Sequence, residues 1–332
     1  MAFPGNITLN NGQVIDPVLT NLVQGYKLAG TVIDKVFYRM PVDIYFGRIP
    51  KMGGEHLRLQ NSVTIGKGNV PEMTYSVTAT DSYEIVNHTL KTWSSRQDWV
   101  QFGGQTRSIE MVNYMLADNL LLGREYAFAS VLQDPTKFTQ TSGLTFGWDD
   151  NTNSTPLADA AYARAQVKAG CGYPPNTVIM SWEVYNVLRS SKQLLGYALA
   201  FYGISGASAF GSGLLNDSQL ALVLGVDRIL VGGAMYNTAE GGQTQSLTSV
   251  WGKNCIFAYI NPSPNPNMAQ QSLGYSMVPS ASSLEGGYET YAYTLPLYEK
   301  PAWEGLNIYQ GRMYDDHITD VTCAFLYTAV IS

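Results

Sequence analysis

The clearest hydrophobic periodicity in the chain lies between Ser108 and Leu132. Apolar residues recur there at intervals of three and four, as on the buried face of a helix. These residues are Ile109, Val112, Leu116, Leu120, Ala127, Phe128 and Val131. Ser108 can cap the start of such a helix, and Asp134 with Pro135 ends it. A helix over 108–132 would be roughly 37 Å long, so the pattern predicts a spine helix across a domain.

Two shorter segments, 62–65 and 73–79, alternate between apolar and polar residues. A period of two is typical of strands that bury one face, so the segments predict a long hairpin with a polar tip. The tip holds Lys67 between Gly66 and Gly68. A lysine in this position either reaches a neighbouring subunit or is an ordinary solvated side chain, and the sequence is compatible with both.

The middle of the chain alternates between short apolar runs and helical patterns, which is typical of an α/β unit. Strands are predicted over 177–180, 228–231 and 254–260, and helices over 155–168, 182–188 and 217–224. Gly170 is expected to close the first helix, and Ser181 is expected to cap the second. From Tyr288 onward, aromatic and β-branched residues predict three further strands.

Residues 1–60 contain scattered apolar positions without a sustained helical period, and prolines interrupt them. This pattern predicts an extended arm with short strands. The first residues lack the basic start and apolar run of a secretory signal peptide. The longest apolar stretch, Leu220–Met235, is broken by a glycine and by charged residues before it reaches the roughly 20 residues of a membrane span. Neither secretion by that route nor a membrane partner is expected.

The composition points to assembly, because only 14% of the 332 residues are charged, against roughly 25% in an average soluble protein. A monomer needs charge to stay dispersed, so a chain this poor in charge is expected to cover much of its surface with other chains. The 20 Lys and Arg against 26 Asp and Glu give a formal charge of −6, and there is no basic run. This balance disfavours a dedicated nucleic-acid-binding protein.

The 3 cysteines are far apart and odd in number, which argues against a disulfide framework and for a reducing compartment. The chain also contains 22 Tyr and 6 Trp, side chains that supply rigid, amphipathic contact area at interfaces. The candidates for subunit contacts are Gly66, Lys67, Gly68, Tyr75, Trp93 and Trp99. Core packing explains the aromatic residues equally well.

No complete catalytic, cofactor-binding or metal motif is found in the sequence. The histidines His56, His88 and His317 lack metal-ligand spacing, and no phosphate loop or dinucleotide fingerprint is present. His317 follows two aspartates, at 315 and 316, but consecutive strand residues point to opposite faces, so this cluster is expected to be a solvated turn. The chain is therefore not expected to be an enzyme, and neither a cofactor nor a metal is expected.

Three segments, residues 181–188, 224–239 and 250–259, carry a family resemblance. They resemble segments of the major capsid proteins of tailed double-stranded-DNA bacteriophages. The first is similar to the helix after the first strand of that family's peripheral domain, the second to a strand and loop of its axial domain, and the third to the next strand. The order of arm, hairpin, spine helix, α/β unit and closing strands is similar along nearly the whole chain. The resemblance implies an α+β protein with the Hong Kong ninety-seven type capsid fold.

The resemblance also implies a division of the chain into parts. The N-terminal arm and first strands would be 1–60, the extended β-hairpin loop 61–100, the peripheral domain 101–200 and 280–332 with the long spine helix 108–132, and the axial domain 201–279.

The implied function is that of a structural head protein, which self-assembles as pentamers and hexamers into an icosahedral shell around packaged double-stranded DNA. The DNA would be enclosed without sequence-specific binding. Implied partners are further copies of the chain, a separate scaffolding protein, a portal and decoration proteins. The protein would reside in the virion, and in the host cytoplasm during assembly. Some members cross-link subunits through a lysine of the extended loop; Lys67 is placed for that role, but the sequence identifies no partner for it.

Three alternatives remain open from the sequence. One is an encapsulin-like shell protein of a bacterial nanocompartment, which shares the architecture. Another is an α/β enzyme that holds a small molecule at the glycine-rich loops around Gly206 and Gly232, although no complete nucleophile, metal or phosphate motif supports it. The third is a tail or other virion component, for which the spine helix and the α/β middle are a poor fit.

Overall fold

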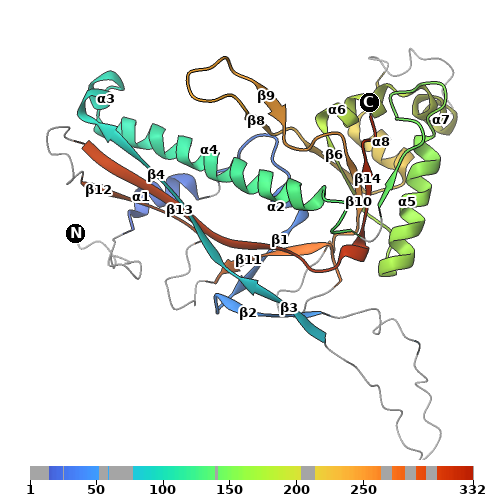
Figure 1. Cartoon of the computed structure of the whole chain (residues 1–332), viewed down its shortest axis with the longest axis horizontal. Coiled ribbons are helices and arrows are strands. Elements are labelled where there is room, and N and C mark those ends of the chain that lie inside the picture. Colours follow the sequence, from blue (N-terminus) through green and yellow to red (C-terminus); the bar gives the residue numbers. More distant parts are fainter. Residues whose placement is uncertain are drawn as a thin grey trace, which may run out of the picture.

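The structure is a computed structural model of the whole chain. It describes residues 15–24, 26–51, 59, 78–138, 141–202, 214–262, 271–280, 289–296 and 305–331. Two five-stranded sheets organise these residues, each with its own helices (Figure 1).

The first, here called the long sheet, has the order β1-β11-β13-β12, and β4 pairs with β13 as well. Its strands are β1 (Tyr38–Val42), β4 (Val86–Ser95), β11 (Gly274–Pro279), β12 (Thr290–Pro296) and β13 (Gly305–Ile318). β1 and β11 run parallel, whereas β13 is antiparallel to all three of its neighbours. β13 is therefore the axis of this sheet.

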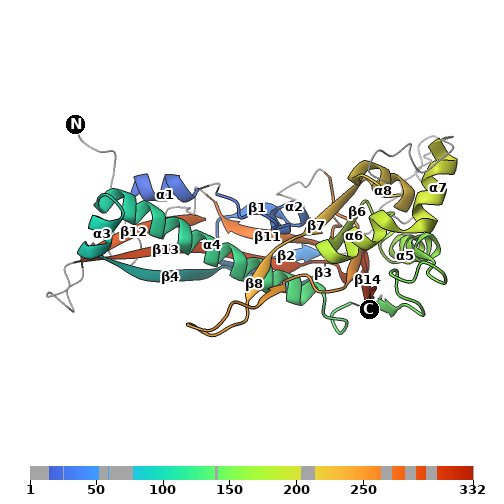
Figure 2. The same cartoon turned by 90° about the horizontal axis from the view of Figure 1, so that it is seen from above.

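Two helices cover one face of the long sheet, α1 (Pro17–Val23) and α4 (Gln105–Leu132) (Figure 2). α4 begins over β4, where the Ser94 and Ser108 hydroxyls lie 2.8 Å apart. α1 lies beside it, since the Asn113 amide donates to the Leu19 carbonyl. The Thr20 hydroxyl donates to the carbonyl of Ala292 on β12. These polar contacts fix both helices on the sheet.

The second sheet belongs to an α/β unit and has the order β5-β14-β10-β6-β7. Its strands are β5 (Thr141–Gly143), β6 (Thr177–Ser181), β7 (Arg228–Gly232), β10 (Cys255–Ala258) and β14 (Ala324–Thr328). Its helices are α5 (Pro156–Cys171), α6 (Trp182–Ser190), α7 (Lys192–Tyr202) and α8 (Asp217–Leu224). Every residue of β6 and β10 is buried, as expected for central strands with both faces covered.

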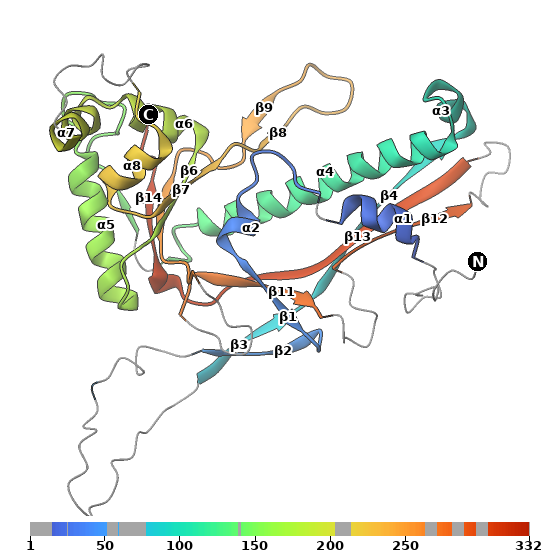
Figure 3. The same ribbon diagram turned by 180° about the vertical axis from the view of Figure 1, so that it is seen from behind.

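The remaining elements are short. β2 (Phe46–Lys51) and β3 (Thr78–Glu84) form a two-stranded ribbon, as do β8 (Met235–Asn237) and β9 (Leu247–Ser249). Figure 3 shows the first ribbon on the side of the long sheet away from α4, and the second standing out on the side of α4. The other elements of the described residues are α2 (Ile33–Val36), α3 (Arg96–Gln101) and a 3-10 turn (Val321–Cys323).

One hydrophobic core connects the two units. The C-terminal end of α4 enters it through Phe128, whose ring lies 4.8 Å from that of Phe37 and 5.9 Å from that of Trp251. Leu132 at the end of the helix is fully buried. The spine helix therefore packs on the long sheet at its start and inside the α/β unit at its end.

The spine helix is confirmed, but its start differs from the prediction. Helix α4 begins at Gln105 after Gly104, whose φ of 135° suits glycine. Ser108 is inside the helix and bonds to Ser94 instead of capping. Similarly, α5 ends at Gly172 in the left-handed region, and not at Gly170. Strands β6 and β7 and helices α6 and α8 lie where the sequence placed them, and Ser181 does cap α6.

The strand pairing cuts across the expected division into 101–200 with 280–332 and 201–279. β6 and β14, from the first of these parts, pair with β10, from the second. β6 also pairs with β7, and β11 joins the long sheet. Local patterns indicate which residues form strands, but pairing between segments far apart in sequence does not follow from them.

The expected parts 1–60 and 61–100 also differ from the structure. Residues 17–23 form helix α1 instead of an extended arm, because Asp16 caps it and Pro17 opens it. β4 belongs to the long sheet, so only residues before it can project as a hairpin. β3 pairs with β2, with Thr78 opposite Lys51, whereas residues 62–65 and 73–77 lie outside the described residues.

Substitutions at two glycines test the packing of β7 against Trp251. A Cβ on Gly232 at the end of β7 would overlap the buried indole of Trp251. We expect Gly232→Ala to lower the free energy of unfolding by roughly 1–3 kcal/mol, because overpacking strains a close-packed core. The matched control is Gly123→Ala in α4, where a Cβ meets nothing within 4 Å and should stabilise the helix by roughly 0.5–1 kcal/mol. Urea denaturation measures the free energy of unfolding of both variants. Equal changes in the two would contradict close packing of Gly232 against Trp251.

Candidate functional site

The histidines and cysteines do not form a reactive centre in the described part of the chain. No group of three His, Cys, Asp or Glu side chains there is placed to hold a metal ion. The 3 cysteines are buried and in no disulfide, and burial raises the pKa of the Cys255 thiol. His88 stacks on Tyr314, and burial lowers its pKa, whereas His56 lies outside the described residues. No described helix is long and apolar enough to cross a membrane.

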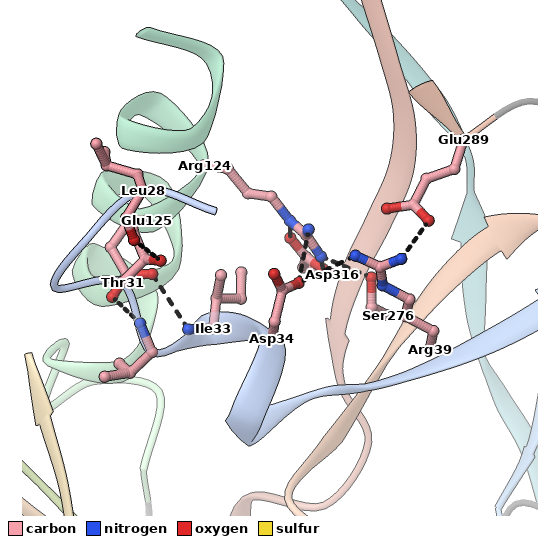
Figure 4. A network of polar contacts seen from close by, with 11 residues as sticks. Leu28, Thr31, Ile33, Asp34, Arg39, Arg124, Glu125, Ser276, Glu289 and Asp316 are labelled. Atoms are coloured by element: carbon pink, nitrogen blue, oxygen red, sulfur yellow. Dashed lines mark hydrogen bonds and ion pairs between the residues drawn. The ribbon is translucent and has the colours of Figure 1, made fainter. Parts of the chain in front are cut away.

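The most developed polar site is a buried joint around Arg124 of α4 (Figure 4). Its guanidinium donates from Nε and Nη2 to the two carboxylate oxygens of Asp316 on β13, at 2.8 and 2.7 Å. It also donates to Ser276 on β11 at 2.8 Å and reaches Asp34 of α2 at 3.3 Å. The Arg124 side chain is 1% exposed. This bidentate pair fixes the helix to two strands of the long sheet and to α2.

The next residue, Glu125, faces the other way and is fully buried. Its carboxylate accepts from the backbone N–H groups of Val32 and Ile33, at 3.0 and 3.2 Å, at the start of α2. It also accepts from the indole of Trp251 at 2.8 Å. Burial raises the pKa of Glu125, and these donors oppose that effect. Consecutive residues of one helix thus hold the long sheet, α2 and the α/β unit together.

The expected solvated turn at 315–317 is wrong. These residues continue β13, and Asp316, whose side chain is only 12% exposed, is the bidentate partner of Arg124. Asp315 points to the other face and accepts from the backbone N–H of Glu84 at 3.1 Å, which ties the β2–β3 ribbon to the long sheet. Strand alternation separates the two carboxylates, so they serve two structural contacts rather than one acid–base site.

The β4–α3 corner is the second candidate site and comprises residues 90–102, where the long sheet ends. Its turn is rigid: Ser95 and Asp98 form a capping box, and these bonds from Ser95 lower the pKa of Asp98. The Trp99 indole donates to the Ser94 hydroxyl at 3.0 Å. Large apolar side chains are nevertheless exposed near this turn, namely Trp93 46%, Val100 82% and Phe102 36%. Exposed large apolar side chains in one short segment are typical of a protein–protein contact.

Comparisons with known proteins agree with this architecture. No protein-family model matches the chain. The chain is 23% identical over 328 residues to the major capsid protein of Burkholderia phage BcepMu. This similarity covers 97% of this chain and 95% of that protein. The fold of a phage-related protein from Bordetella bronchiseptica is similar at a TM-score of 0.71, with 21% identity and coverage of 96% of this chain and 98% of that one.

Two further solved structures belong to assembled shells. The capsid structure of a cyanophage is similar at a TM-score of 0.52 and 11% identity, over 91% of this chain and 90% of that one. An encapsulin from Synechococcus elongatus is similar at a TM-score of 0.50 and 9% identity, over 92% and 93% of the two chains. The chain has the phage capsid fold. The Hong Kong ninety-seven type fold that the sequence resemblance implied is thereby confirmed.

Within the capsid fold, the structure places two of the six predicted contact residues. Trp93 and Trp99 both lie at the β4–α3 corner, but Trp93 is half-exposed on β4, whereas Trp99 turns back to Ser94. The other four, Gly66, Lys67, Gly68 and Tyr75, lie outside the described residues. The corner therefore keeps Trp93 as a contact candidate and gives Trp99 a role within the subunit.

Sequence reasoning missed the joint and most of the exposed corner. A signal for the joint exists, because Arg124 continues the four-residue spacing of Leu116, Leu120 and Phe128 along the buried side of α4. A charged residue in an apolar stripe must find a partner. Nothing comparable marks Val100, since its exposure depends on where α3 ends.

The two arginines that contact Asp34, Arg124 and Arg39, are expected to contribute unequally to the free energy of unfolding. Arg124→Met leaves Asp316, whose side chain is only 12% exposed, without its bidentate partner, so we expect unfolding to become easier by roughly 3–5 kcal/mol. Arg39 is 49% exposed where it contacts Asp34 and Glu289, so Arg39→Met should cost less than roughly 1 kcal/mol. Guanidinium chloride unfolding followed by circular dichroism compares the two variants. Similar losses from both would show that the joint is not the main tether of α4.

Proposed function

We propose that the chain is the major capsid protein of a phage head and self-assembles into an icosahedral shell of pentamers and hexamers around double-stranded DNA. One observation carries this proposal: a protein named as a major capsid protein is similar along almost the whole of both chains. The phage capsid fold, over a similar extent of the chain, supports it independently. The proposed role is structural, without a catalytic residue or a cofactor.

The shape of the subunit suits this role. Two ribbons project from the body on opposite sides of the long sheet (Figure 3), and each can reach a neighbouring copy. Several weak contacts of this kind become strong together through multivalency. The low charge of 14% and the net charge of −6 fit a wall that encloses DNA without binding its sequence.

The domain boundaries in this proposal follow the strand pairing. The long sheet with α4, the spine helix, would form the peripheral domain, and the sheet that contains β7 would form the axial domain with α5 to α8. β2 and β3 would be the base of the extended loop, with Gly66, Lys67, Gly68 and Tyr75 beyond it.

The proposed partners are other copies of the chain, a separate scaffolding protein, a portal and decoration proteins. The assembled protein would belong to the virion, after assembly in the host cytoplasm. An encapsulin-like compartment shell is the second candidate, because its fold is also similar. The sequence relationship favours the phage protein. The content of purified particles separates the two, since a shell of the second kind would hold an enzyme instead of DNA.

Negative-stain microscopy with size-exclusion chromatography tests the proposal, on the chain alone and with the products of neighbouring genes. Rings of five or six, or closed shells, are expected. A monomer or dimer under every condition, including high protein concentration, would contradict the proposed function. Uniform closed shells from the chain alone would instead contradict the need for a separate scaffolding protein.

The β4–α3 corner gives a sharper prediction about assembly. Val100→Asp places a charge on a side chain that is 82% exposed, so the unfolding free energy should change by less than about 0.5 kcal/mol. Assembly should be lost, because the charge would be desolvated in a subunit contact. Val100→Ile is the matched control and should assemble normally. Light scattering during assembly measures the effect. Normal assembly of the aspartate variant would show that the corner is not part of a subunit contact.

A further inference from the structure

Arg312 on β13 is a buried cation whose Nε atom finds no hydrogen-bond partner among the described residues. It lies on the face of β13 that also carries Tyr314 and Asp316, toward α4. Only 3% of the residue is exposed, and its Nε atom is buried without a hydrogen-bond partner. No described residue makes a hydrogen bond or ion pair with its guanidinium, although the group carries five N–H donors. Burial accordingly lowers the pKa of Arg312.

The carboxylates around Arg312 are engaged elsewhere. Glu289 bonds to Arg39 at 2.9 Å, on the right of Figure 4. Asp34 lies 3.6 Å from Arg39 and 3.3 Å from Arg124, and Asp316 forms the bidentate pair with Arg124. Lys27 also borders the site. Among the described residues, four cationic groups thus face three carboxylates, which leaves one positive charge unmatched.

A small pocket opens at this guanidinium. Lys27, Asp34, Arg39, Glu289, Thr290 and Arg312 line it. Its volume is about 60 Å³, enough for a few waters or one small oxyanion but not for a nucleoside. Two of the lining groups are themselves carboxylates, and they would repel a doubly charged phosphate or a polyanion more than a single carboxylate.

We propose that this pocket receives one carboxylate side chain from a second copy of the chain. The planar fork of a guanidinium matches a carboxylate in two parallel hydrogen bonds, and a single negative charge would balance the unmatched positive one. The chain supplies such groups in excess, with 26 Asp and Glu against 20 Lys and Arg. The inference rests on the proposed assembly, which brings copies into contact.

The substitution Arg312→Met tests the pocket through two effects of opposite sign. In unassembled subunits, the apolar side chain replaces an unsatisfied buried cation of similar size, so the melting temperature should rise by about 2–4 °C. In assembly, the carboxylate of the neighbour loses its partner, so the concentration needed for shell formation should rise roughly ten-fold. Arg124→Met is the contrasting variant, because its partners are in the same subunit and its loss should lower the melting temperature.

Several outcomes would overturn the proposal. A lower melting temperature of the unassembled Arg312→Met subunit would mean that a carboxylate of the same chain occupies the pocket. Assembly of this variant at the wild-type concentration would mean that the pocket lies outside the subunit contacts. Failure of the wild-type chain to assemble at all would instead count against the proposed function, and would be recognised before any variant is compared.

Free anions in solution test whether the pocket prefers a carboxylate or a phosphate. Sodium acetate, against sodium chloride at equal ionic strength, should raise the melting temperature of unassembled wild-type subunits and leave Arg312→Met unchanged. A larger rise with sodium phosphate than with acetate, again absent from the variant, would assign the pocket to phosphate and overturn the proposal. No rise with acetate in the wild-type subunits would also overturn it.

Discussion

The bidentate pair between Arg124 and Asp316 is the contact on which the rest of the subunit depends. A guanidinium that is 1% exposed is tolerated only where its partners are held in place. The pair therefore fixes the rotation of α4 about its axis, and that rotation directs Glu125 toward α2 and Trp251. Apolar contacts alone could not set this rotation, because they are not directional.

Local features of the fold could be read from the sequence where one short pattern decides the element. The spacing of apolar residues gave α4, and Ser181 before an amphipathic run gave α6 with its cap. Helix α1 was missed because only its 7 residues are helical, too few to show a period. β11 was missed as well, since it is buried along its whole length and shows no alternation.

The candidate site was predictable only in part, for a related reason. Trp93 and Trp99 were identified from residue type, and both lie at one corner of the long sheet. Their different roles follow from the direction of β4 and from the turn into α3, and neither can be deduced from residue type. Asp316 was assigned to solvent because its partner Arg124 is 192 residues away in the sequence. Contacts of this range follow from topology, which single-sequence patterns do not determine.

The position of β14 has a consequence for synthesis of the chain. This strand lies inside the α/β unit, between β5 and β10, although it is formed by residues 324–328. Both neighbours therefore have an unpaired edge until the ribosome has made residues 324–328, and unpaired edges invite pairing with the wrong partner. The sheet also has to close over a long stretch of sequence, which slows folding. Nascent chains of this protein are thus expected to need protection by chaperones, and only a chain that includes β14 can present the complete unit to a growing shell.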